Sequence, residues 1–302
     1  MKILYSTFGF IHNSLLTICL VCLTGQPLAA EVYEVPLIDS ETRSKFVEVN
    51  VDGIQERFAF DTGCSGLSIN IRLAHELARQ GKIRLADMHE QTEATLANGA
   101  THTVRTLIIK QIEIGGCTFR NVVAMVGTND APDAPLLIGQ SVLERMRWYR
   151  IEGLKLQFEP YDETYQQVLS MAEFYYDDPK HAPALAEQLA PYYNEGRLSC
   201  FYACKYLSVL QKTEDYASGL QVLEHIRQSG CKIDDDDLTV VETQLYYNIS
   251  VNAYNSGRME QAAQAKDSAR TSARAIKDAA IRRKYLDRIA ELDQYIKAQL
   301  QQ

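Results

Sequence analysis

The hydrophobic pattern of the chain changes its period once, near Pro160, and this change limits the folds open to it. Before this point, short segments such as 45–51 alternate apolar and polar side chains, the period of β-strands. After it, Ala, Leu, Gln, Glu and Tyr recur at helical spacing to the end. A length of 302 residues suits two modest domains. We therefore predict an α+β multidomain protein, with an all-β domain over 31–160 and an all-α domain over 161–302.

The first half predicts a closed or sandwiched β domain, because it contains many short strands separated by regular turns. Asp52-Gly53 and Gly115-Gly116 are typical of tight hairpin turns. The expected strands cover 45–51, 56–60, 103–114, 119–126, 136–138 and 154–158, and short helices are expected over 71–80 and 141–147.

The second half predicts an array of helical hairpins. Gly196, Gly230 and Gly257 fall at expected helix ends, where a left-handed residue is needed. Segment 250–266 resembles a tetratricopeptide repeat (TPR), although its spacing from the similar segment 205–223 exceeds the roughly 34 residues of that repeat. The predicted domain is therefore TPR-like, with family membership left open. The expected helices cover 163–175, 184–193, 199–211, 216–228, 238–256, 259–277 and 281–300, and the acidic run 234–237 is interpreted as a helix start.

The N-terminus has the features of a secretory signal peptide over residues 1–30. Lys2 precedes a short apolar stretch over 15–23, and small residues end the segment at Ala30. An uncleaved anchor is the alternative, although the apolar stretch is short for a membrane span. We expect an exported protein, in the bacterial periplasm or secreted, with no membrane span after signal cleavage.

Composition excludes some partners and cofactors. The net charge is −8, and no block rich in Lys or Arg is present, so we expect no nucleic-acid partner. No clustered His pair accompanies the cysteines, so we expect neither a metal nor another cofactor. Cys200 and Cys204 share a helical face, and one of them is predicted to form a disulfide with Cys231.

The segment 58–65 carries the strongest chemical signal. An apolar strand runs directly into Asp61, and Thr62, Gly63, Cys64 and Ser65 follow in a predicted tight turn. Asp is also common in such turns for structural reasons, because its side chain accepts backbone hydrogen bonds. The surrounding sequence must therefore decide between structure and chemistry.

That context resembles the retropepsin-like (clan AA) aspartic peptidases, and most closely their bacterial exported single-domain members, over about 35–160. In that family an apolar strand leads into Asp-Thr-Gly, and a later apolar run ends in Gly before a short helix. Here the later run ends at Ile138 and Gly139. Between the two, the segment 95–101 looks like the hairpin flap that covers substrate, with Ala97, Asn98 and Gly99 at its tip.

The resemblance implies an aspartic endopeptidase in which Asp61 is the catalytic residue. Thr62 would brace the paired loops, and Gly63 would let the chain approach the attacking water. Cys64 replaces the usual Ala or Ser, and it could serve either as a small packing residue or as a redox-sensitive position.

The reaction needs two carboxylates, but the sequence contains no second Asp-Thr-Gly or Asp-Ser-Gly. The resemblance therefore implies a homodimer through the peptidase domain, with peptide or protein substrates. The alternative is a catalytically inactive binding module whose helical domain recruits a partner protein. A protein partner at the helical domain is possible under either hypothesis.

Overall fold

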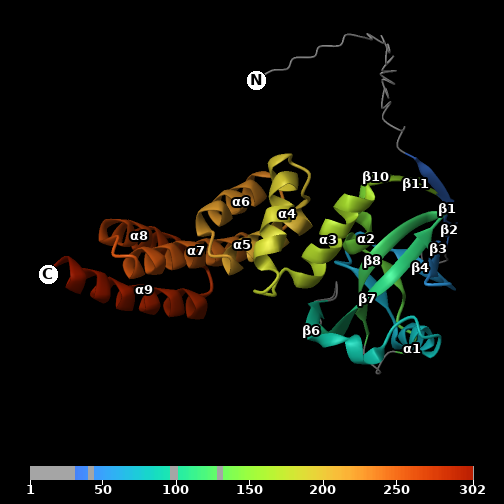
Figure 1. Cartoon of the computed structure of the whole chain (residues 1–302), viewed down its shortest axis with the longest axis horizontal. Helices are drawn as coiled ribbons and strands as arrows, with labels where there is room; N and C mark the ends of the chain where they lie inside the picture. Colours follow the sequence, from blue (N-terminus) through green and yellow to red (C-terminus); the bar gives the residue numbers. More distant parts are fainter. Residues whose placement is uncertain (1–30, 40–43, 96–100, 128–131, 302) are drawn as a thin grey trace, which may run out of the picture. The chain divides into compact units, whose positions relative to one another are not determined.

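The computed structural model describes residues 31–39, 44–95, 101–127 and 132–301. The described residues from Val32 onward belong to one compact unit (Figure 1). The predicted signal peptide and the predicted flap tip, Ala97, Asn98 and Gly99, lie outside the described residues.

The N-terminal half forms a β-barrel. In its larger sheet the neighbouring strands run in the order β2-β3-β4-β9-β5-β8-β7-β6. β3 also pairs with β7, with Val49 opposite Ile114, and this pairing closes the sheet on itself. The strands are β2 (Ile38–Asp39), β3 (Lys45–Val51), β4 (Ile54–Phe60), β5 (Leu67–Ile69), β6 (His89–Thr95), β7 (Thr101–Ile114), β8 (Cys117–Val126) and β9 (Leu137–Ile138).

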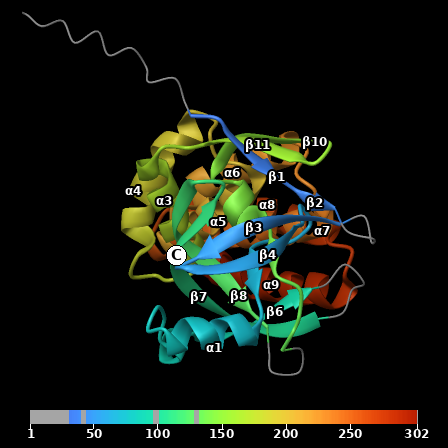
Figure 2. The same cartoon turned by 90° about the vertical axis from the view of Figure 1, so that its right-hand side faces the viewer.

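A smaller sheet joins the two ends of this half. It has the order β1-β11-β10, made of β1 (Tyr33–Pro36), β11 (Lys155–Pro160) and β10 (Met146–Glu152). This sheet and helix α1 (Ile71–Arg79) lie on opposite sides of the barrel (Figures 1 and 2).

The barrel core follows from the strand alternation. In β3, Val47, Val49 and Val51 are fully buried, whereas Glu48 between them is exposed. The hairpin turn after β3 has Asp52 at φ 47° and Gly53 at φ 99°, as the predicted Asp-Gly turn requires. The α+β fold class predicted from the change of period is confirmed.

One predicted helix is partly wrong. Helix α2 covers Gln140–Leu143 only, and the chain then enters strand β10 instead of continuing helically to residue 147. β10 carries Trp148, Tyr149 and Ile151, which favour strands, and it pairs along its length with β11. Hairpin pairing with the next strand, β11, therefore outweighs the helical preference expected for this segment.

The second half consists of successive helices that pack on their neighbours in sequence (Figure 1). Several predicted boundaries agree within two residues, and Gly196, Gly230 and Gly257 have φ of 68°, 70° and 73° at helix ends. The helices are α3 (Glu163–Tyr175), α4 (Ala182–Asn194), α5 (Cys200–Lys212), α6 (Tyr216–Gln228), α7 (Asp235–Asn255), α8 (Met259–Ala275) and α9 (Ala279–Leu300).

Two further predictions in this half are confirmed. The Asp234 side chain caps α7, and the next three aspartates occupy its first turn. Cys200 and Cys231 form a disulfide with their Cα atoms 5.7 Å apart, which links the start of α5 to the segment after α6. None of the helices in the described ranges is both long and apolar enough to span a bilayer.

Candidate active site

Asp61 lies directly after β4, where the parallel neighbouring strand β9 holds the backbone in position. Phe60 pairs with Ile138 of β9. The Asp61 N–H donates to the Ile138 carbonyl at 3.0 Å, and the Ala59 N–H donates to the Leu136 carbonyl at 2.8 Å. Two adjacent strands thus hold the backbone that carries this carboxylate.

The turn after Asp61 is stabilised by the aspartate itself. The Gly63 N–H donates to Asp61 Oδ1 at 2.8 Å, and the Cys64 N–H donates to the Asp61 carbonyl at 3.3 Å. Asp61 is half-buried, while Thr62 and Gly63 are exposed. A Cβ at Gly63 would lie 3.3 Å from Asp61 Oδ1, so glycine keeps this carboxylate uncrowded. The turn is structurally ordinary, yet it presents an acid at the surface.

The N-terminus of α2 braces this turn through Gln140. Its backbone N–H donates to the Cys64 carbonyl at 2.8 Å, and its side-chain amide donates to the Thr62 carbonyl at 2.7 Å. Ile138, just before, is fully buried. The sequence pattern pointed to Ile138 and Gly139 but not to Gln140. The position of Gln140, directly after an apolar run and a glycine, could have indicated its role in bracing the turn.

Gly139 allows this close approach. A Cβ built there would clash with the backbone carbonyls of Cys64 and Gly66. The next residue but one, Ser141, accepts the Leu67 N–H on its hydroxyl at 2.7 Å. The brace therefore reaches from Thr62 to the start of β5.

Cys64 has the features of a packing residue. It is half-buried, and its thiol donates to the Gly66 carbonyl at 3.2 Å. Burial raises the pKa of the thiol and the nearby charge of Asp61 raises it further, against an opposing effect of the Gly66 carbonyl. A thiol with a raised pKa is less reactive, which favours the packing role over a redox role. Ser65 is exposed, with its hydroxyl 3.9 Å from the Met125 sulfur.

The strands beside the predicted flap pair as a hairpin would. Thr95 of β6 lies opposite Thr101 of β7, directly at the edges of the segment that carries the predicted tip. The role of Ala97, Asn98 and Gly99 stays a prediction.

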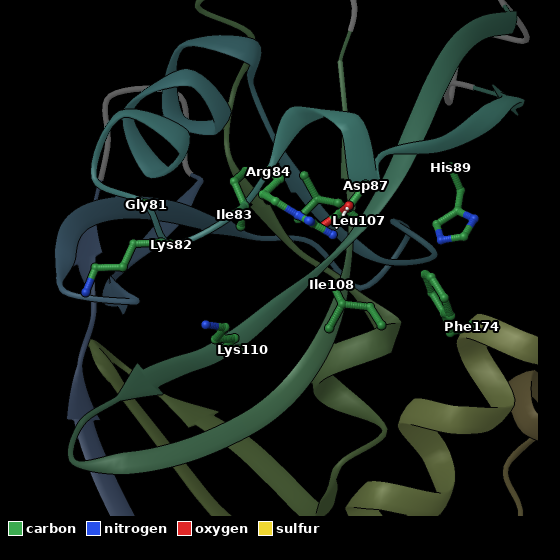
Figure 3. A pocket seen from close by; sticks show the side chains of 10 residues that line it. All are labelled: Gly81, Lys82, Ile83, Arg84, Asp87, His89, Leu107, Ile108, Lys110 and Phe174. Carbon is green, nitrogen blue, oxygen red and sulfur yellow. Dashed lines mark hydrogen bonds and ion pairs between the residues drawn. The ribbon is translucent and has the colours of Figure 1, made fainter.

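The cavity in Figure 3 is not at this site. It has a volume of about 450 Å³ and lies among the end of α1, the 3₁₀ helix η1 (Leu85–Asp87), β6, β7 and α3. His89 faces Phe174 with ring centroids 4.4 Å apart, and the Lys82 and Lys110 side chains do not converge on a common point. Its lining residues are Gly81, Lys82, Ile83, Arg84, Asp87, His89, Leu107, Ile108, Lys110 and Phe174.

Two further aspartates, Asp130 and Asp133, precede the second apolar run without the Asp-Thr-Gly motif. Asp133 is exposed and lies 3.9 Å from Arg72, and Asp130 falls outside the described residues. In the ranges that the structure describes, no group of three or more His, Cys, Asp or Glu side chains could hold a metal ion.

Comparison with known proteins supports the assignment of this half. Residues 47–145 match the family model of the gag-polyprotein putative aspartyl protease. The matched stretch contains both Asp61 and the bracing α2. Residues 47–145 are therefore similar to retropepsin-like aspartyl proteases, as the resemblance implied.

A search of solved structures found a similar protein, a retropepsin-like aspartic protease from Rickettsia conorii. It is 21% identical, with a TM-score of 0.33, and the match covers 44% of this chain and 94% of that chain. No curated protein matches the chain.

Proposed function

We propose that this protein is an aspartic endopeptidase that acts as a homodimer and uses Asp61 from each subunit. The observation that carries the proposal is the Asp61 turn: a half-buried acid on an exposed turn, fixed by two strands and braced by Gln140. Such rigidity is what a catalytic group needs in order to keep its geometry.

The chemistry requires two carboxylates in contact. One takes a proton from a water molecule, which attacks the peptide carbonyl, while the other, protonated, donates a proton to the carbonyl oxygen. Two close carboxylates do not both ionise readily, so they share one proton and titrate at separated values. Each chain supplies one Asp-Thr-Gly motif, so a twofold dimer completes the pair.

Substrates of this site would be peptides or unfolded proteins, and the signal peptide predicted over residues 1–30 would bring the enzyme to an exported location. The alternative, an inactive barrel whose helical half recruits a partner protein, predicts binding without turnover.

Cleavage of an unfolded protein at acid to neutral pH, with and without a pepstatin-like transition-state mimic, separates these functions. Asp61→Asn should lower turnover by about 10³-fold because it removes the group that exchanges the proton. The matched control is Asp133→Asn, an exposed acid that should leave cleavage unchanged. Wild type that binds but never cleaves, or an Asp61→Asn variant that keeps cleaving, would reject the peptidase.

A further inference from the structure

A buried chain of hydrogen bonds connects the helical half to the Asp61 turn. It runs from Glu173 on α3 to the Arg145 guanidinium, from there to the Ser141 carbonyl, and from the Ser141 hydroxyl to the loop that follows Asp61. We infer that Glu173 is a positioning residue for the catalytic turn, so that the helical half is part of the catalytic unit and not only a module for recruiting partners. This inference rests on the proposed function.

Arg145 ties α2 to the barrel. Its side chain is fully buried. Nε donates to the Ser141 carbonyl at 2.8 Å, Nη1 to the Arg120 carbonyl at 2.6 Å, and Nη2 to the Asn121 carbonyl at 3.3 Å. A guanidinium stays charged in proteins, so its burial requires that acceptors surround it.

Glu173 supplies the matching charge from the helical half. Its Oε2 accepts a hydrogen bond from Arg145 Nη2 at 3.5 Å, and the nearby Ser141 hydroxyl lowers the pKa of this carboxyl. One turn earlier on α3, the Ser170 hydroxyl lies 3.3 Å from the Arg120 carbonyl. α3 therefore docks on β8 and α2 through polar groups as well as through packing. A buried ion pair of this kind contributes more to a defined geometry than to stability, which is the role proposed here.

Ser141 passes this constraint to the catalytic loop. Its backbone carbonyl accepts from Arg145 Nε at 2.8 Å, and its hydroxyl accepts the Leu67 N–H at 2.7 Å. The preceding residue, Gln140, holds the Thr62 and Cys64 carbonyls. Arg145, Ser141 and Gln140 thus link the Glu173 carboxylate to the turn that carries Asp61.

The surroundings of Glu173 make the contact sensitive to its charge. Arg145 and Lys205 face it with positive charge, and the buried Tyr202 of α5 lies within electrostatic reach. Burial raises the pKa of Glu173 to about 7, against the opposing effect of these two cations. Loss of the negative charge alone, as in Glu173→Gln, should therefore change how Arg145 is held, and through Arg145 the position of Ser141.

Hydrogen exchange of the full chain tests this link without requiring catalysis. Glu173→Gln and Ser141→Ala should each raise exchange of the backbone amides over 63–69 about tenfold or more, while the rest of the barrel stays protected. The matched control is Glu242→Gln, which breaks a bidentate ion pair with Arg227 between α6 and α7. Both contacts of this pair are 3.1 Å long, and the pair lies far along the chain from the loop.

Kinetics provide the second readout. Glu173→Gln should lower kcat with KM little changed, because the substitution displaces the loop that follows Asp61 and leaves the substrate-binding surface in place. Unchanged exchange over 63–69 in both variants, or an equal effect of Glu242→Gln, would overturn the inference. If Glu173→Gln does not fold, Ser141→Ala tests the same link from the barrel side. Failure of the proposed function has a different signature: wild type would not cleave, whatever the exchange results.

Discussion

At the scale of single residues, the Asp61 turn depends on close backbone contacts as much as on its acid. Gly139 shows this most clearly, because any side chain there meets the Cys64 and Gly66 carbonyls. We expect Gly139→Ala to destabilise the fold by about 2 kcal/mol and to lower any cleavage activity more than 10-fold, since backbone would have to move.

The control for this substitution is Gly127→Ala, because nothing described lies within 4 Å of a Cβ built there. Its thermal midpoint should stay close to that of wild type. Equal midpoints for the two variants in thermal unfolding would mean that the contact between α2 and the turn is not tight.

The same scale explains what the sequence could predict of the site. The Asp-Thr-Gly motif could be predicted, because Asp61, Thr62 and Gly63 are adjacent in the chain. The apolar run ending in Gly139 could likewise be predicted as the segment that pairs with it. The roles of Arg145 and Glu173 could not be predicted, because neither residue belongs to a local sequence motif. In a sequence, a charged residue that is buried cannot be told from one exposed to solvent until its partner is known.

At the scale of elements, the prediction succeeded where hydrophobic periodicity determines the secondary structure and failed where strand pairing determines it. The seven helices expected after Pro160 were found because each has its own apolar face and end signals. β6 was missed because its sequence, His89–Thr95, is polar except for Ala94, and it forms a strand through its pairing with β7. β10 was missed for another reason: its first residues were assigned to the helix predicted over 141–147.

The docking of α3 on α2 predicts a pH dependence of stability. The Glu173 pKa is about 7 in the folded protein against its usual 4.5, so the native state binds the proton more tightly than the unfolded state. The contribution of Glu173 protonation to the free energy of unfolding is fully present below about pH 4.5 and is lost as the pH rises to about 7. This contribution is on the order of 3 kcal/mol. Glu173→Gln should flatten that fall in urea unfolding measured from pH 4.5 to 7.5. An unchanged slope in the variant would mean that Glu173 does not titrate there.

The disulfide gives a prediction for the helical elements. Cys200 and Cys231 are 31 residues apart, and closing such a loop stabilises a fold by about 2–4 kcal/mol. Cys200→Ser should lower the midpoint of the helical half, whereas Cys204→Ser, at a half-buried thiol outside the disulfide, should have a smaller effect. Mass mapping without reductant should recover the linked peptides; finding both thiols unmodified would contradict the pairing.

At the scale of the whole molecule, the account requires two chains for one site. A single chain presents Asp61 on an exposed turn with one such motif in its sequence, and the proposed reaction needs two carboxylates that share a proton. The helical half, tied to α2 through Glu173, would then be present twice in the active assembly.

The most direct test of the homodimeric peptidase mixes wild type with an excess of Asp61→Asn chains, after subunit exchange has been established separately. Most wild-type chains would then face an inactive partner, and their shared sites would hold one ionisable Asp. Activity per wild-type chain should fall roughly in proportion to the wild-type fraction. An added variant that cannot dimerise should leave activity unchanged. If exchange is complete and activity per wild-type chain stays constant, each chain carries a complete site, and the paired Asp61 mechanism is wrong.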